Sequence, residues 1–166
     1  HIEKECQALQ TIGFIVRVAL PPKFLISGLD VEIDLMAYDF CEMHRATFHS
    51  QLPAIQQALA FLHDHGVSLK RVHLGLTKDG RLYKNVSSGM TMGYGQAGEL
   101  AQSVDVDLYL EKNPAAKMYY TSFGGVFQSF IYNPEANEWI SYDDPRTLQS
   151  KIEWARHSGL RGVFFN

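Results

Sequence analysis

A chain of 166 residues, 46% hydrophobic and 20% charged, is long enough to bury one full hydrophobic core, and this composition excludes a disordered, collagen-like or coiled-coil protein. The net charge of −3 and the scattered basic residues give no electrostatic reason to expect nucleic acid or a membrane surface as a partner. No apolar run approaches the roughly 20 residues of a membrane helix, and the first ten residues lack the features of a signal peptide. The compartment therefore cannot be read from the ends of the chain.

The first half of the chain alternates predicted strands with predicted helices. Residues 2–12 carry apolar side chains at helical spacing and end at a glycine, which predicts a helix. The runs "FIVRVAL" (14–20) and "VEIDLMAYDF" (31–40) are apolar and rich in β-branched residues, and prolines close the first of them. Both are expected to be buried strands. Residues 53–65 start with proline, place Ile and Leu on one face and stop at a glycine, which predicts a second helix.

The second half contains two more predicted strands separated by a long insertion. The strands are "RVHLGL" (71–76) and "RGVFFN" (161–166), and a helix that Asp144 caps and Gly159 ends precedes the last one. The segment 84–142 is far longer than an ordinary strand-to-helix loop. It includes "QSFIYNPEANEWISY", two aromatic runs around a turn, which predicts an antiparallel hairpin within a small inserted subdomain.

No metal or nucleotide site is indicated by these residues. The chain has two cysteines, neither in a CxxC pair, and its histidines lack the spacing of metal ligands. The glycine-rich "GYGQAG" at 93–98 follows no predicted strand. We therefore expect no cofactor and no metal.

Strands alternating with helices imply a parallel sheet or barrel built from right-handed crossovers. A parallel sheet exposes unpaired backbone groups at an open edge, and this chain ends on an apolar strand with nothing to cover it. The sequence thus indicates a piece of a larger fold. The alternative is a self-contained α/β domain, which would have to leave that edge open.

Four segments, in order, resemble the second half of a family 18 glycoside hydrolase, the chitinase and chitinase-like group. They are "DLMAYDF", "FHSQL", "GVSLKRVHLGLTKDGRLY" and "EWISYDDPRTLQSKIEWARHSGLRGVFF". The resemblance implies a (β/α)8 TIM barrel of which this chain holds strands five to eight. It assigns barrel strands five to seven to residues 1–83, the insertion to 84–141, and the last helix and strand to 142–166.

The resemblance also implies a chemistry and a set of site residues. Family members cleave β-1,4-linked N-acetylglucosamine polymers with the substrate's own acetamido group as nucleophile. Alternation along the strand puts Met36 and Tyr38 on one face, where the family's tyrosine hydrogen-bonds the acetamido oxygen and the methionine packs beneath the sugar. Asp39 would point away under strict alternation, so its implied catalytic role requires a bulge or the end of the strand. Arg81 stands at the family's glycine-arginine turn and is implied to reach bound sugar.

Three departures from the family pattern bear on activity. The family's catalytic acid belongs to Asp-x-x-Asp-x-Asp-x-Glu, a spacing absent from this chain, while Asp79 and Asn166 replace an aromatic residue and a substrate-stacking tryptophan. By its position in the resemblance, Asn166 is still expected to contact the substrate. We expect the catalytic Glu upstream of His1, in the missing N-terminal half of the barrel, which is either part of the same polypeptide or an associated chain. The alternative is a non-catalytic chitinase-like carbohydrate-binding or structural module. Secretion follows from the resemblance alone.

Overall fold

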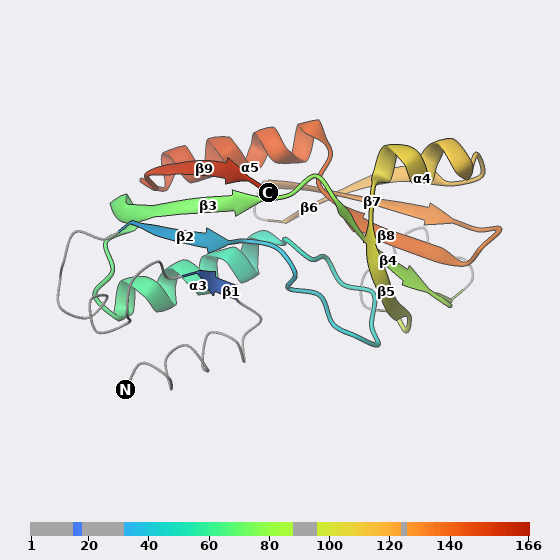
Figure 1. The fold of residues 1–166 in the computed structure, drawn as a ribbon, viewed down its shortest axis with the longest axis horizontal. Coiled ribbons are helices and arrows are strands. Elements are labelled where there is room, and N and C mark those ends of the chain that lie inside the picture. The colour runs from blue at the N-terminus through green and yellow to red at the C-terminus, as the bar shows by residue number, and fades with distance from the viewer. Residues whose placement is uncertain (1–14, 18–31, 88–95, 124–125) are drawn as a thin grey trace.

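The computed structural model of the protein describes residues 15–17, 32–87, 96–123 and 126–166. These residues form two β-sheets that lie end to end, with the first sheet and its helices on one side of Figure 1 and the second sheet on the other. The predicted helix at 2–12 lies outside the described residues.

The first sheet has the strand order β1-β2-β3-β9. Its members are β1 (Ile15–Arg17), β2 (Ile33–Met36), β3 (Val72–Leu76) and β9 (Gly162–Phe165). β2, β3 and β9 are parallel, as predicted. β1, in contrast, pairs with β2 antiparallel, so the expectation that this strand joins a parallel sheet is wrong. The three described residues of the run 14–20 pair with β2 in this direction, which apolar alternation along a strand does not determine.

Two helices cover one face of this sheet, α3 (Leu52–Asp64) and α5 (Pro145–His157), and a short 3₁₀ turn, Leu69–Arg71, leads into β3. The Asp144 carboxylate caps α5 by accepting from the backbone N–H of Thr147, as predicted. Ile, Leu, Val and Ala side chains from both helices and the strands β2 and β3 form the core between the layers. No helix in the described part of the chain is both long and apolar enough to span a membrane.

The second sheet is inserted between β3 and β9 and has the order β5-β4-β8-β7-β6. Its elements are β4 (Gly80–Lys84), β5 (Glu99–Val104), α4 (Val106–Lys112), β6 (Lys117–Phe123), β7 (Val126–Asn133) and β8 (Glu138–Tyr142). All its strand pairs are antiparallel. The predicted hairpin is confirmed as β7 and β8.

Alternation along these strands gives the second sheet two apolar faces. Trp139, Tyr83 and Phe130 pack with Phe48 from the segment after β2, with ring centroids 5.4 Å apart for Phe48 and Trp139. The opposite face packs Ile131 and its neighbours against α4. The segment that follows β2 is thereby held between the two sheets.

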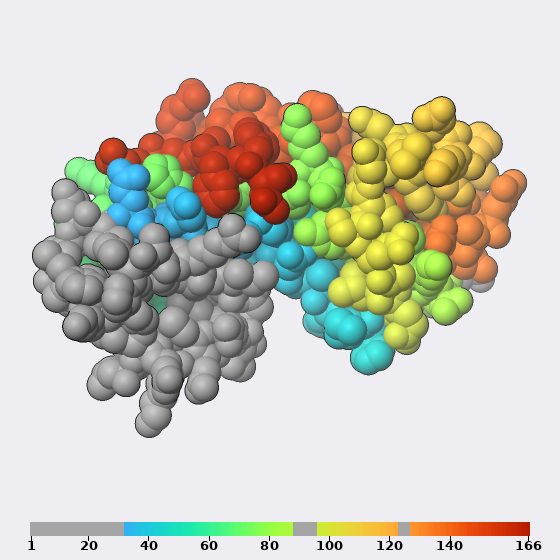
Figure 2. All heavy atoms as spheres, viewed as in Figure 1, coloured from blue at the N-terminus to red at the C-terminus, as the bar shows by residue number. Residues whose placement is uncertain are grey.

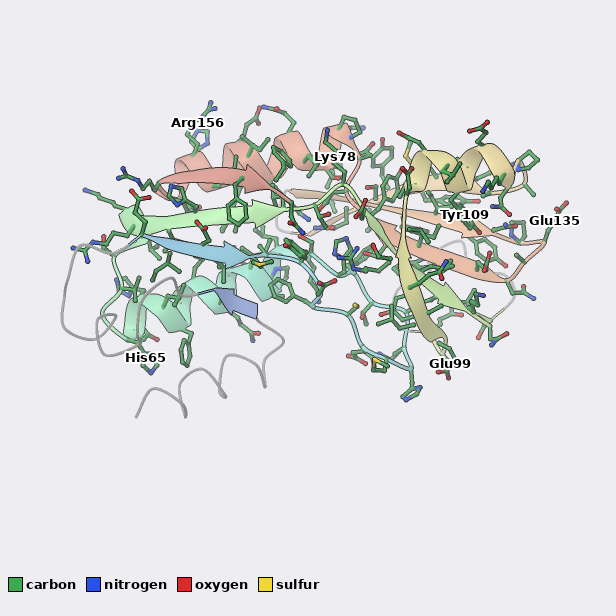
Figure 3. All side chains as sticks on the ribbon, viewed as in Figure 1. His65, Lys78, Glu99, Tyr109, Glu135 and Arg156 are labelled. Atoms are coloured by element: carbon green, nitrogen blue, oxygen red, sulfur yellow. The ribbon has the colours of Figure 1, made fainter. Side chains whose placement is uncertain are left out.

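The carboxyl ends of β2, β3 and β9 all point toward the second sheet (Figure 1). Figure 3 places Lys78, which follows β3, at this junction. The face of the first sheet away from the helices carries Met36 and, deeper, Asp34, whose carboxylate lies 3.3 Å from His73 Nδ1. The Phe164 ring packs over Gly75 on this face. A Cβ at position 75 would come within 2.5 Å of that ring.

Candidate functional site

The predicted site residues of the "MAYD" run lie at the end of a strand or directly after it. β2 ends at Met36, and the backbone of Asp39 has φ = +68°, a left-handed conformation that non-glycine residues rarely adopt. The strand therefore ends before Asp39 and no longer forces it to the opposite face. The sequence analysis required a bulge or a strand end for Asp39 to reach the site, and Asp39 lies just beyond a strand end.

Arg81 on β4 reaches across to Asp39. Its Nε donates to Asp39 Oδ1 at 2.5 Å, and its Nη1 donates to Ser103 Oγ at 3.0 Å. The Arg81 side chain is 12% exposed and that of Asp39 35%. Charge-assisted bonds of this kind are strong and directional, so Arg81 holds the carboxylate in place and leaves its second oxygen for another donor.

Tyr38 and Met36 lie side by side beneath this ion pair. Tyr38 is 2% exposed, and its hydroxyl donates to Met36 Sδ at 3.5 Å. A thioether sulfur is a weak acceptor. The Tyr38 hydroxyl therefore points toward Met36 through a weak bond. A carbonyl oxygen of a ligand would readily replace the sulfur as acceptor, once the contact with Met36 is broken.

A buried lysine that was not among the predicted site residues joins α5 to the segment that follows β2. Lys151 of α5 is 0% exposed, and its ammonium group contacts both Asp143 oxygens, at 2.8 and 2.7 Å, and Ser50. Burial lowers the pKa of Lys151 from its ordinary value, while the Asp143 carboxylate opposes that shift. A sequence signal existed, because Lys151 lies between Leu148 and Ala155 on the apolar stripe of α5.

His49, which precedes Ser50, is also buried and was not predicted to be a site residue. It is 1% exposed, and neither ring nitrogen has a hydrogen-bond partner among the described residues. Burial, and then the positive charges of Arg81 and Lys151, hold the pKa of His49 well below its usual range. The imidazole is neutral at neutral pH.

This burial predicts a pH-dependent stability. Above about pH 6.5 the His49 ring is neutral in the folded and unfolded states, and below it only the unfolded state gains a proton. The free energy of unfolding should therefore fall by up to about 1.4 kcal/mol per pH unit through this group as the pH falls.

Denaturant unfolding of the full-length protein at pH 7.5 and 5.5 should show a smaller loss of this free energy in His49→Gln than in the wild type. The exposed His63 provides the control, since His63→Gln should keep the wild-type loss, and an equal loss in all three proteins would contradict the prediction.

The remaining predicted residue, Asn166, lies at the end of β9, where its backbone N–H donates to the Leu76 carbonyl at 2.9 Å. It is exposed, and no contact described in the structure joins it to Tyr38, Asp39 or Arg81. Its predicted contact with sugar stays a prediction. Among the described residues there is no group of three His, Cys, Asp or Glu side chains that could hold a metal.

A cleft of about 410 Å³ lies beside the junction but does not contain the predicted residues. Its lining includes Lys78, Asp79, Asp105, Asp107, Tyr142 and Asp144. Figure 2 shows the segment after β3, in green, between the red C-terminal strand and the yellow second sheet. We place the candidate site at the strand ends, because a left-handed aspartate, an ion pair and a tyrosine meet there, whereas the Asp144 carboxylate in the cleft is occupied by the α5 cap and Tyr120.

Comparison with known proteins identifies the family of the chain. The sequence profile of the glycosyl hydrolases family 18 matches residues 25–165. A class V chitinase of Lotus japonicus is 30% identical over 106 residues, which are 60% of this chain and 26% of that protein. The chain thus spans about a quarter of that relative.

Solved structures show the same fold. A class V chitinase mutant from Cycas revoluta in complex with (GlcNAc)3 superposes with a TM-score of 0.71 at 20% identity, over 89% of this chain and 44% of that one. A chitinase-like agglutinin from Robinia pseudoacacia gives 0.67 at 17% identity, over 86% and 43%. The described α/β half therefore has the architecture of the TIM-barrel fold family, and the chain belongs to glycosyl hydrolase family 18.

Proposed function

We propose that this chain is the C-terminal part of a chitinase-type (β/α)8 barrel, in which the parallel strands β2, β3 and β9 are barrel strands six to eight and the second sheet is the insertion between strands seven and eight. The observation that carries the proposal is the ion pair between Arg81 of β4 and Asp39, which follows Tyr38 just beyond the end of β2. Enzymes of this architecture place their chemistry at the carboxyl ends of the strands. The missing strands would complete the sheet at its open edge.

The proposed reaction is retaining hydrolysis of β-1,4-linked N-acetylglucosamine polymers with substrate assistance. The Tyr38 hydroxyl exchanges its weak bond to Met36 for one to the acetamido oxygen, which orients that oxygen toward the sugar carbon. Asp39 accepts a hydrogen bond from the sugar through the oxygen that Arg81 does not use. A glutamic acid outside this chain protonates the leaving oxygen.

The Asp39–Arg81 ion pair also limits what Asp39 contributes electrostatically. A carboxylate near the catalytic acid would help to keep that acid protonated. The Arg81 guanidinium, only 2.5 Å from Asp39 Oδ1, offsets most of that charge. We therefore assign Asp39 to orienting the substrate and Arg81 to holding Asp39, in addition to the proposed contact of Arg81 with sugar.

A chitinase-like binding module without turnover is the second candidate function. Asp79 and Asn166 stand where the resemblance implies aromatic residues, and loss of a stacking surface weakens sugar binding. The likeness to an agglutinin in fold is compatible with this candidate. Both candidate functions bind sugar at the same strand ends and assume an extracellular location. They differ in whether a catalytic glutamic acid is present.

Turnover of a chitin oligosaccharide by the full-length protein separates the two functions. We expect a tetramer of N-acetylglucosamine to be cleaved with retention of the anomeric configuration, as followed by NMR of the freshly formed product. Binding without cleavage would favour the module. Neither binding nor cleavage would contradict both candidates.

A further inference from the structure

The backbone that carries Tyr38 is held by a chain of buried polar contacts that starts on a distant helix. Lys151 has three N–H donors, and the structure gives them three acceptors: the Asp143 carboxylate, the Ser50 carbonyl and the Ser50 hydroxyl, the last at 3.1 Å. The hydroxyl of Ser50 in turn donates to the Ala37 carbonyl at 2.5 Å. Ala37 lies between Met36 and Tyr38.

Further contacts hold the same segment on both sides of Tyr38 and Asp39. The backbone N–H of Ala37 donates to the Gly75 carbonyl at 2.9 Å, and that of Phe40 donates to the His49 carbonyl at 2.9 Å. Ser50 thus links this strand end to Lys151 of α5 through hydrogen bonds. Because the chain leaves the strand at Met36 and turns left-handed at Asp39, the ladder of the sheet no longer determines where Tyr38 points.

Stability alone does not account for the buried lysine. Replacing a buried ion pair by well-packed apolar residues is often neutral or stabilising. A fully satisfied buried polar network does, however, select one geometry of the groups that it joins. The group at the end of this network is the carbonyl next to the proposed substrate-orienting tyrosine.

We propose that Ser50 and Lys151 are positioning residues for the site at the end of β2. Lys151, held by Asp143, fixes the Ser50 hydroxyl, and Ser50 fixes Ala37 and with it the directions of Tyr38 and Asp39. The inference rests on the proposed function for its catalytic consequence, but the local ordering of residues 37–40 follows from the contacts alone.

The test compares Ser50→Ala with Ser129→Ala in the full-length protein. The Ser129 hydroxyl is equally buried, donates to the Tyr142 carbonyl at 2.8 Å and accepts from the Asp144 N–H at 3.1 Å. Each substitution therefore removes one hydrogen-bond donor and one acceptor from the region around α5. Of the two hydroxyls, only that of Ser50 bonds to the segment at the end of β2. We expect Ser50→Ala to lower kcat on the chitin tetramer by about tenfold or more, the order that small misplacements of reacting groups cause, while Ser129→Ala keeps kcat within about twofold.

Amide hydrogen exchange of residues 37–40 gives a second readout that needs no turnover. We expect these amides to exchange at least about tenfold faster in Ser50→Ala and at the wild-type rate in Ser129→Ala. Equal effects of the two substitutions on exchange would overturn the inference, and so would an unchanged kcat in an active Ser50→Ala protein. A wild type without turnover would contradict the proposed reaction, and exchange would then decide the positioning role by itself.

Discussion

Replacing Lys151 by methionine is expected to lower the free energy of unfolding of the full-length protein by about 3–5 kcal/mol, the usual effect of removing one partner from a buried ion pair. Asp143 is 3% exposed and receives its closest charge-assisted contacts from this lysine. Without the ammonium group the carboxylate stays buried without its charge partner, and Ser50 loses a donor. Denaturant unfolding monitored by tryptophan fluorescence measures the change.

Two further variants separate the charge effect from the loss of packing. Lys151→Met combined with Asp143→Leu removes both charges and should recover most of the lost stability, since no buried charge remains unpaired. Lys112 is exposed near the end of α4, so Lys112→Met should change stability by no more than about 0.5 kcal/mol. If Lys151→Met behaved like Lys112→Met, the ion pair described here would carry no stability.

If the proposed reaction is right, replacing Tyr38 by phenylalanine is expected to lower kcat of the full-length protein on chitin oligosaccharides by about 100- to 1,000-fold, the effect of removing one aligned hydrogen-bond donor from a reacting oxygen. The ring stays, so its contacts in the core are kept. The substitution removes the bond that the hydroxyl donates to Met36 Sδ, and losing a hydrogen bond of a neutral group lowers the free energy of unfolding by about 1 kcal/mol. Steady-state kinetics and denaturant unfolding measure the two effects.

Tyr109 provides the matched control for the hydroxyl. Its OH donates to the Glu138 carboxylate at 2.9 Å within the second sheet, and Figure 3 places it away from the junction. Burial raises the pKa of Tyr109 to about 12, so its hydroxyl stays protonated under assay conditions. Tyr109→Phe should keep kcat within about twofold. Comparable losses in both variants would mean that the effect of Tyr38→Phe is structural.

Most of the fold could be predicted because each prediction rested on a local pattern. Pro145 and the Asp144 cap define the start of α5, and two apolar runs around a turn define the β7–β8 hairpin. The glycines at 66 and 159, which end the second and third predicted helices, have φ of +84° and +78°. The antiparallel pairing of β1 could not be predicted, because apolar alternation is the same in both strand directions.

The candidate site was only partly predictable, for a related reason. The Tyr38–Asp39 pair is visible in the sequence, but the Arg81–Asp39 contact joins residues 42 positions apart. The link from Lys151 to Ser50 spans 101 positions. Such contacts depend on how the two sheets pack, which no local pattern describes. The segment "FHSQL" was noted for its resemblance, but no local pattern predicted the burial of His49, whose backbone N–H donates to Ser141 of β8 in the second sheet.

The central claim is that the end of β2 and the start of β4 bind the acetamido sugar that the proposed reaction cleaves. A crystal structure of the full-length protein with a chitin tetramer tests it most directly. The account predicts the Tyr38 hydroxyl within about 2.6–3.2 Å of an acetamido oxygen, with Asp39 still bonded to Arg81. A sugar bound only in the cleft that Asp105 and Asp107 line, with Tyr38 still on Met36, would contradict it.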